Sequence, residues 1–192
     1  PICVARQWIR HRTARLNEIS GRYSILKAEF YVPDGKDIAL QSSDNKQGRM
    51  NEAVSQDLQN EVINSLQKQQ EEIYAGYSKL LDKNIARELA RINLPLSTYT
   101  EWYWQIDLHN LFHFLALRLS SHAQKEIREY AFGILSICKK VAPIATASFE
   151  EHTLYGKKLS KNEISSILSI INGDAVPKEK IEEIKAKLEN TL

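Results

Sequence analysis

The chain has 192 residues, enough for one compact domain with a substantial core or for one domain with an appended tail. Its 26 basic and 24 acidic residues leave a net charge of only +2, which excludes a general polyanion-binding surface, so any phosphate site must be local. Only Cys3 and Cys138 occur, which excludes a disulfide framework and is typical of reduced thiols in a cytoplasmic protein.

The sequence shows neither a membrane-spanning segment nor a signal peptide. No apolar run approaches the roughly 20 residues that span a bilayer, and no signal-peptide pattern opens the sequence. We therefore expect a cytoplasmic protein without a membrane partner. The first residue is Pro1 rather than Met, and the opening letters PICVARQWIRHR are typical of the interior of a protein, so we expect a leader segment before them.

The first part of the chain predicts a helix, a strand and a loop, in that order. From Pro1 to Ile9 the apolar residues recur at helical spacing, so a short helix delivers residues 10–12 at its end. After a turn at Ser20 and Gly21, apolar and polar residues alternate over 26–32, which predicts a strand ended by Pro33. Residues 34–50 are polar and contain glycine, which predicts a surface loop.

The middle of the chain predicts two helices and a second strand. Residues 51–81 carry apolar side chains at intervals of three, four or seven and contain no proline, so we expect one long amphipathic helix. Another helix is expected over 84–94, stopped by Pro95. The segment 99–106 is rich in aromatic residues, which predicts a strand.

The last part is predicted to be helical. Asp107 stands where an N-cap belongs, ahead of a helical run over 108–119. Ser120 or Ser121 caps the next helix, which ends near Lys140, and Pro143 begins another. Two further helical patterns, over 161–172 and 177–188, lie in a helical tail of residues 157–192. The whole pattern predicts an α+β fold, with one helix-rich domain over 1–156.

One stretch, RHRTARLNEISGRYS at residues 10–24, gathers chemistry suited to phosphorylated small molecules. It contains Arg10, Arg12, Arg15 and Arg22 together with an imidazole, a carboxylate and several hydroxyls. An arginine fork matches phosphate oxygens in pairs, and each charge-assisted bond contributes roughly 1.5–3 kcal/mol. The simpler interpretation is a solvated, charged loop.

A second stretch, residues 106–131, is rich in histidine. His109 and His113 lie one helical turn apart on one face, and His122 with Glu126 makes a second such pair. A metal site needs a third or fourth ligand, and no HExxH, ExxH or cysteine pair supplies it. We therefore predict no metal; the alternative interpretation of these histidines is hydrogen-bonded residues of a core or interface.

Together, these stretches resemble the flavin-dependent thymidylate synthase family. RHR is followed by seven residues and a serine, with N-E-x-S-x-R-Y-S inside, and D-L-H-N-L-x-H-F-L-x-L-R precedes H-A-Q-x-E-I-R-x-Y-A. The segment ARINLPLSTYTEWYW between them is also similar to the family. The resemblance covers residues 1 to 155 and leaves out the tail.

The resemblance implies a set of cofactor and substrate contacts. Arg118 is placed against the uracil ring as the catalytic residue, where a fixed cation stabilises negative charge on the pyrimidine. Glu18 lies between the flavin and the nucleotide, and Arg22 binds the phosphate of dUMP. The implied FAD-contacting residues are Arg10, His11, Arg12, Glu18, Asp107, Leu108, His109 and His113. The implied dUMP-contacting residues are Gln7, Trp8, Ile9, Arg10, Glu18, Ile19, Ser20, Gly21, Arg22, Arg91 and Arg118.

The implied activity is reductive methylation of dUMP to dTMP. In the family, NADPH reduces FAD, methylenetetrahydrofolate supplies the one-carbon unit, and the reduced flavin delivers hydride. The resemblance also implies a small antiparallel sheet and a homotetramer with active sites shared between subunits, and we expect the aromatic strand and the long helix to form subunit contacts. The residues themselves support flavin chemistry over covalent attack by a thiol, because neither cysteine has an adjacent base that would activate it as a nucleophile. Ser20 also lacks a neighbouring base in sequence, so we assign it to binding.

The chain departs from the family pattern at several positions. Arg15 stands where many members have serine, and Asp107, His109 and His113 stand where several have asparagine or arginine. Family members also place FAD- and folate-contacting groups, including a histidine, before the point where this chain begins.

Two other hypotheses remain open from the residues alone. One is a nucleic-acid module that uses Arg10, Arg12, Arg22 and the aromatic residues 102–104 for stacking, although the near-neutral charge argues against it. The other is a helical metalloenzyme centred on His109, His113, His122 and Glu126.

Overall fold

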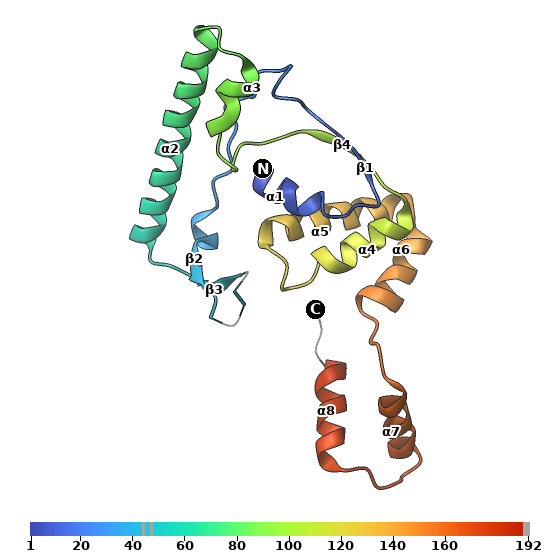
Figure 1. Cartoon of the computed structure of the whole chain (residues 1–192). Coiled ribbons are helices and arrows are strands. Elements are labelled where there is room, and N and C mark those ends of the chain that lie inside the picture. Colours follow the sequence, from blue (N-terminus) through green and yellow to red (C-terminus); the bar gives the residue numbers. More distant parts are fainter. Residues whose placement is uncertain (44, 47, 190–192) are drawn as a thin grey trace. The chain divides into compact units, whose positions relative to one another are not determined.

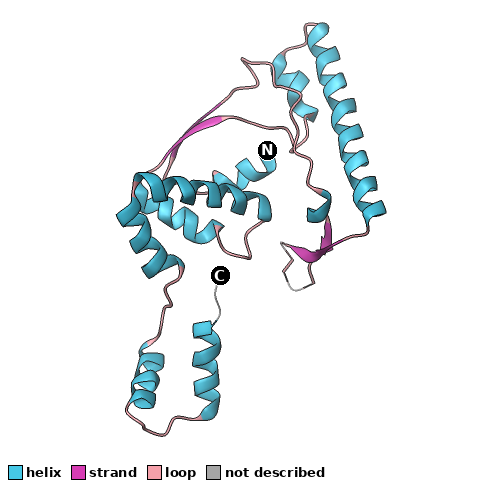
Figure 2. Cartoon of the chain, turned by 180° about the vertical axis from the view of Figure 1, so that it is seen from behind, coloured by secondary structure: helices cyan, strands magenta, loops and turns pink. Residues whose placement is uncertain are grey.

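We analysed a computed structural model of the chain, which describes residues 1–43, 45–46 and 48–189 (Figure 1). The helices and strands are α1 (Ile2–Trp8), β1 (Arg15–Glu18), β2 (Ala39–Gln41), β3 (Arg49–Ala53), α2 (Gln56–Asp82), α3 (Arg87–Ala90), β4 (Trp102–Gln105), α4 (Leu108–Arg118), α5 (Lys125–Val141), α6 (Pro143–Phe149), α7 (Lys161–Ile171) and α8 (Lys178–Glu189). Short 3₁₀ turns η1 (Gly35–Asp37) and η2 (Arg91–Asn93) and a π-helical turn η3 (Glu150–Leu154) connect some of them. The predicted helix-rich α+β class is confirmed (Figure 2).

The chain packs as two compact units. The first unit comprises residues 1–111 with 122–127, and the second comprises 112–121 with the chain from Arg128 onward. The first unit holds both sheets, each of two antiparallel strands, β1 with β4 and β2 with β3, where one small sheet was expected. The predicted boundary between a domain over 1–156 and a tail over 157–192 stays a prediction.

The strand predicted over 99–106 is confirmed as β4, and its partner β1 was missed by the sequence analysis. The register pairs Arg15 with Gln105 and Glu18 with Trp102. All four residues of β1 are exposed, so the segment has no alternation of buried and exposed side chains that would indicate a strand. Its extended conformation therefore depends on hydrogen bonds to β4, a strand that is distant in sequence.

The strand predicted over 26–32 is wrong, because the segment forms only an isolated bridge between Phe30 and Thr98. The Tyr31 N–H donates to the Ser97 carbonyl at 2.9 Å, and the Tyr99 N–H donates to the Glu29 carbonyl at 3.0 Å. Continuing this register would place Pro33 opposite Pro95, and neither proline has an N–H to donate. The ladder therefore ends after one bridge.

Side chains of α2 form further hydrogen bonds with the backbone of this segment. The Gln70 amide donates to the Tyr31 carbonyl at 3.0 Å, and the Tyr74 hydroxyl donates to the Leu26 carbonyl at 3.1 Å. The Tyr77 hydroxyl accepts from the Leu26 N–H at 3.1 Å. Gln70 and Tyr77 are buried, so they fix the segment against the helix.

The loop predicted over 34–50 and the start of the next helix need correction. The described part of this region contains η1 and the hairpin of β2 and β3, and residues 44 and 47 lie outside the described residues. Because β3 uses Arg49–Ala53, α2 begins at Gln56 rather than at residue 51. Arg49 bonds to the buried Glu126 at 2.7 Å, which anchors the hairpin in the first unit.

The helix predicted over 84–94 is also mostly wrong. Asn84 adopts a left-handed backbone conformation, with φ of 57°, which ends α2. Only the single helical turn α3 and the 3₁₀ turn η2 follow before Leu94 becomes extended. The helical pattern over 84–94 therefore breaks into two short turns around the buried Ala90.

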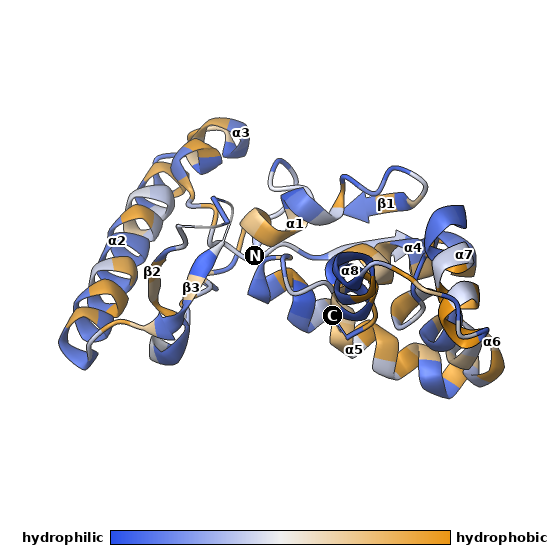
Figure 3. Ribbon diagram, turned by 90° about the horizontal axis from the view of Figure 1, so that it is seen from below, coloured by the Kyte–Doolittle hydropathy of each residue, from blue (hydrophilic) through white to orange (hydrophobic). Residues whose placement is uncertain are grey.

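The remaining helices follow the predictions more closely. Asp107 caps α4 as expected, because its carboxylate accepts the Asn110 N–H at 2.9 Å. α5 begins at Lys125, later than a cap at Ser120 or Ser121 would place it. α6 begins at Pro143 as predicted, and Phe149 at its end stacks on Phe112 with ring centroids 4.5 Å apart. Hydrophobic residues line α5 and α6 (Figure 3).

The predicted helices of the C-terminal region are confirmed as α7 and α8. Ser160 and Glu163 form a reciprocal capping box at the start of α7. Lys187 of α8 reaches the Glu163 carboxylate at 2.7 Å, so one carboxylate both caps α7 and joins it to α8. Across the described residues, no helix is both long enough and apolar enough to cross a membrane.

Glu163→Gln is expected to loosen this helical pair. Lys187 first, and then the bonds with Ser160, lower the pKa of Glu163 to about 2 from its ordinary 4.5. The carboxylate therefore stabilises the fold above pH 4.5, and this contribution is lost as the pH falls toward 2. We expect the first amides of α7 to exchange with solvent roughly tenfold faster in the variant at pH 7, as measured by hydrogen exchange. Glu182→Gln, which removes an exposed pair with Lys185, is the control and should leave α7 unchanged.

Candidate functional site

The segment between β1 and the Phe30 bridge is a loop with both ends attached to the same stretch of chain. At one end the Ile19 N–H donates to the Glu101 carbonyl at 2.9 Å. At the other end the Glu29 carbonyl accepts the Tyr99 N–H at 3.0 Å. Because these anchors are close together on one extended segment, residues 20–28 form a closed loop with a defined entry and exit.

This loop begins with the tight turn that contains the predicted phosphate-binding residues. The Ser20 carbonyl accepts the N–H groups of Tyr23 and Ser24 at 3.0 and 2.9 Å. The Arg22 N–H donates to the Ser20 hydroxyl oxygen at 3.3 Å. Gly21 is buried at the centre of the turn.

Arg91, which is distant in sequence, packs directly against Gly21. A Cβ atom on Gly21 would lie 3.1 Å from the Arg91 Cδ, 3.2 Å from its Nη1 and 3.1 Å from the Leu26 Cδ1. Glycine is therefore the residue that lets the Arg91 side chain approach the turn without displacement. The structure thus brings Ser20, Gly21, Arg22 and Arg91 together, and their role in binding dUMP stays a prediction.

Two residues that the sequence analysis missed complete this cluster. Glu88 pairs with Arg22, with Oε2 and Nη2 3.1 Å apart, and Arg87 donates to the Tyr23 carbonyl at 3.0 Å. Both lie in α3, within one turn of Arg91. Their position before ARINLP is visible in the sequence, but nothing in the sequence indicates that α3 faces the Ser20 turn.

Glu18 and Ile19 lead into the turn. The Thr100 hydroxyl donates to the Glu18 carboxylate at 2.5 Å, which orients a side chain that is otherwise exposed. Thr100 was not predicted as a site residue. It precedes β4 and holds Glu18 near the register pair of Glu18 and Trp102.

The end of α1 carries the next predicted group. Trp8 packs edge-on against Trp102 and Trp104, with ring centroids 5.8 and 5.3 Å apart. Gln7 donates a hydrogen bond to Gln124, and Ile9 is 49% exposed. The two strand tryptophans thus fix α1 on the sheet, and this packing argues against their use for stacking bases in a nucleic-acid module.

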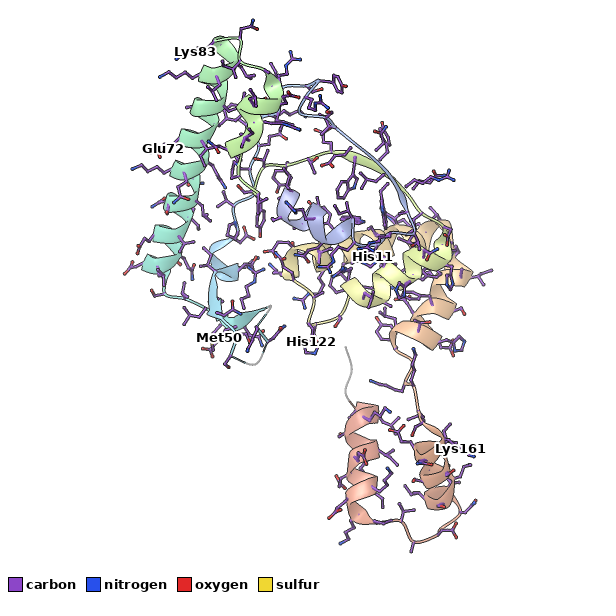
Figure 4. The ribbon with its side chains drawn as sticks, in the orientation of Figure 1. His11, Met50, Glu72, Lys83, His122 and Lys161 are labelled. Atoms are coloured by element: carbon purple, nitrogen blue, oxygen red, sulfur yellow. The ribbon has the colours of Figure 1, made fainter. Side chains whose placement is uncertain are left out.

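The RHR segment follows α1 in a turn. The N–H of His11 donates to the Trp8 carbonyl at 3.0 Å. Arg10 and Arg12 are exposed, whereas His11, which is labelled in Figure 4, is half-buried. The two guanidiniums are therefore accessible to an anionic ligand.

A cavity of about 410 Å³ lies between residues that follow the RHR segment and residues just before α4. Its lining residues are Thr13, Arg15, Gln105, Ile106 and Asp107. Asp107 also bonds to the Asn110 backbone and side chain at 2.9 and 2.6 Å, and these bonds lower the pKa of its carboxyl. Arg15, which departs from the family pattern, is thus a cavity residue. Leu108, His109 and His113 follow on α4, where Leu108 is 38% exposed and both histidines are exposed.

The second pair considered as metal ligands, His122 with Glu126, is not available, because Glu126 has other partners. Arg49 and Tyr31 donate to its Oε1 at 2.7 and 2.8 Å. Burial raises the pKa of the Glu126 carboxyl, but the Arg49 bond and its other hydrogen bonds outweigh burial, and the net shift is downward. The structure describes no group of three or more His, Cys, Asp or Glu residues, within its described ranges, that would hold a metal ion. The metalloenzyme hypothesis therefore gains no support.

Arg118 lies in the last turn of α4, within the second unit, and is half-buried. Cys138 is buried in α5, and burial raises the pKa of its thiol, as expected for a structural cysteine. Cys3 is half-buried in α1. The catalytic assignment of Arg118 stays a prediction.

The elements define this chain as a helix-rich α+β protein in which Arg91 packs against the Ser20–Arg22 turn. Residues 1–144 match the family described as thymidylate synthase complementing protein. The chain therefore belongs to this family, and the resemblance seen in the sequence is confirmed.

Several relatives of the chain carry the name flavin-dependent thymidylate synthase. The protein of Treponema denticola is 80% identical over 173 residues, which cover 90% of this chain and 65% of the relative. The protein of Treponema pallidum is 54% identical over 192 residues, covering 100% of this chain and 62% of the relative. The chain is thus shorter than two thirds of the length of these relatives.

Solved structures are also similar. The UMP/dUMP methylase PolB from Streptomyces cacaoi, bound with 5-Br UMP, has a TM-score of 0.72 and 36% sequence identity. The match covers 78% of this chain and 68% of PolB. A second structure of this methylase, bound with 5-Br dUMP, has a TM-score of 0.69 and 34% identity, covering 78% of this chain and 66% of that chain.

Trp8→Ala is expected to destabilise the protein by about 2–4 kcal/mol, because it removes two edge-on ring contacts and leaves space between α1 and β4. Chemical denaturation monitored by circular dichroism measures this loss. Tyr103→Ala is the matched control, because Tyr103 lies between the two tryptophans on β4 but is 85% exposed. An equal loss in both variants would contradict the role of Trp8.

Proposed function

We propose that this chain is the corresponding part of a flavin-dependent thymidylate synthase, which converts dUMP to dTMP by reductive methylation. The reaction uses methylenetetrahydrofolate and NADPH as co-substrates and FAD as the cofactor. The observation that carries the proposal is the packing of Arg91 on Gly21 inside the Ser20–Arg22 turn. This packing joins two segments that resemble the family's dUMP-binding motifs, in a chain whose relatives carry that name.

The nucleotide phosphate fits the arginine-lined turn. Arg22 and Arg91 supply two guanidiniums, whose planar forks suit phosphate oxygens. Ser20 and Gly21 keep the turn compact enough for both to reach one anion. Gln7, Trp8, Ile9, Arg10, Glu18 and Ile19 would complete the dUMP site. The 5-Br dUMP bound by the similar methylase agrees with a pyrimidine nucleotide as substrate.

The residues also fit FAD. Arg10 and Arg12 are exposed cations suited to a pyrophosphate, and the cavity lined by the nearby Thr13 and Arg15 reaches Asp107. We assign FAD to Arg10, His11, Arg12, Glu18, Asp107, Leu108, His109 and His113. When bound, the flavin supplies hydride transfer. The protein holds the nucleotide by its phosphate and orients it toward that cofactor.

Arg118 is the residue we assign to catalysis. A fixed cation next to the uracil ring would stabilise the negative charge that develops on the pyrimidine. A covalent thiol mechanism has no support, because Cys138 is buried with a raised thiol pKa. Ser20 is committed to the turn through the Arg22 N–H, in agreement with a binding role.

The proposal is tested on the purified full chain. We expect a flavin absorption band after incubation with FAD, and dTMP formation from dUMP that requires FAD, NADPH and methylenetetrahydrofolate. Arg118→Ala should lower turnover at least about 100-fold and should affect the denaturation midpoint far less. Protein that stays colourless with FAD would contradict the assignment of the cofactor, and equal losses of activity and stability would contradict the role of Arg118.

We also propose that the chain assembles as a homotetramer in the cytoplasm, with neither nucleic acid nor membrane as a partner. Large apolar side chains remain exposed on and next to α5 and α6. They are Phe132 (56% exposed), Ile137 (59%), Val141 (73%) and Ile144 (87%). Large exposed apolar side chains of this kind are typical of surfaces that another protein chain covers.

Sedimentation at working concentration is expected to give a tetramer. Ile144→Asp should shift the equilibrium toward smaller species, because assembly would bury an unpaired carboxylate. Leu40→Asp, at a 61% exposed position in β2, should leave the distribution unchanged. A monomer in the unmodified protein would contradict the proposed assembly.

A further inference from the structure

The anion site contains a carboxylate that the proposed reaction does not explain. Glu88 Oε2 lies 3.1 Å from Arg22 Nη2, at the turn where the nucleotide phosphate is proposed to bind. A carboxylate and a phosphate that share one guanidinium repel each other when both are close to it. The acid would therefore be unfavourable in the complex unless it moves away.

The other two arginines around the turn are held in a different way. Arg87 donates to a backbone carbonyl, that of Tyr23, at 3.0 Å. Arg91 is half-buried and packs against Gly21 and thus has little freedom to move. Of these three arginines, Arg22 is the one that the structure pairs with an acid.

The pair between Arg22 and Glu88 is suited to being broken. Their side chains are 58% and 53% exposed, so water solvates both charges after separation. Exposed ion pairs contribute little to stability, so little free energy is lost when Arg22 leaves Glu88 and binds another anion. A buried pair such as Arg49 with Glu126 would not allow such an exchange.

We propose that Glu88 occupies Arg22 in place of the substrate phosphate and is displaced when dUMP binds. This inference rests on the proposed function and deepens it. The carboxylate keeps the guanidinium at the turn in the empty site, and a phosphate dianion displaces it because it carries more charge and more acceptor oxygens. Glu88 therefore lowers the affinity for ligands that carry a phosphate and leaves the affinity for nucleosides unchanged, because nucleosides have no group that competes with it.

One short segment supplies both Arg91, which stays against the turn, and Glu88, which competes with the phosphate for Arg22. Glu88 belongs to α3, and Arg91 begins η2 three residues later, so both lie within about one helical turn. Arg91 stays against the turn through its packing, while only the Glu88 side chain must rotate. The exchange thus needs a change of side-chain rotamer and no movement of the backbone.

Glu88→Gln tests the proposal in titrations of the full chain by calorimetry at fixed ionic strength. The variant removes the competing charge and keeps the size of the side chain. We expect the Kd for dUMP to fall by about three- to fivefold, and the Kd for inorganic phosphate to fall as well. The Kd for deoxyuridine should be unchanged. Glu72→Gln is the charge-matched control, because Glu72 lies on α2 beside Lys68, and it should leave all three values unchanged (Figure 4).

A double-mutant cycle identifies the route of the effect. In an Arg22→Ala background, Glu88→Gln should no longer change the affinity for dUMP or for phosphate, since the guanidinium that links the two is gone. An unchanged or weaker affinity for dUMP and phosphate in Glu88→Gln overturns the proposal, and so does an equal change for deoxyuridine. If the unmodified chain binds no dUMP while Glu88→Gln still tightens phosphate, the proposed function fails and the exchange stands.

Discussion

Backbone hydrogen bonds along residues 97–105 are the constraint on which the site depends, because this segment pairs with two stretches that lie far from it in the chain. β1 pairs with its second half, and the Phe30 bridge pairs with its first half. The loop between those stretches is thereby closed, with Ile19 and Glu29 attached close together. Its conformational entropy is restricted before any ligand arrives, so the turn at Gly21 is formed in advance. Trp8 packs on the tryptophans of the same segment and brings the end of α1 to it.

Charges in the first unit separate into two kinds according to burial. Glu126 is buried and holds Arg49 and Tyr31, and Lys125 pairs with Asp37 where both side chains are mostly buried. These groups join the hairpin and η1 to the start of α5, and removing one partner would leave a charge uncompensated. Around the Ser20 turn, in contrast, Arg22 and Glu88 are more than half exposed. A binding site needs charges of the second kind, because only accessible and weakly paired groups exchange partners for a ligand.

The agreement between prediction and structure follows the range of the interactions involved. The capped helices α4 and α7, the helix α8 and the proline start of α6 were predicted well, since caps and periodicity act within a few residues. The strand over 26–32 failed because Pro33 faces Pro95 in the register and α2 side chains bond the segment, and neither relation is local. The helix over 84–94 failed at Asn84, whose left-handed backbone ends α2. β1 was missed because its side chains are all exposed and its pairing partner is distant.

For the site, the sequence by itself determined the types of residue and their order: the guanidiniums of the RHR segment, the Ser-Gly-Arg turn, Arg91 and the cap at Asp107. These are local patterns, and their resemblance to the family to which the chain belongs was enough to predict which residues form the site. Only the tertiary structure decided that Arg91 lies on Gly21, that Glu88 holds Arg22, and that Glu126 belongs to a buried ion pair rather than to a metal site. The physical reason is that such contacts join residues through space, after β pairing and helix packing have brought distant segments together, and no spacing along the chain encodes that approach.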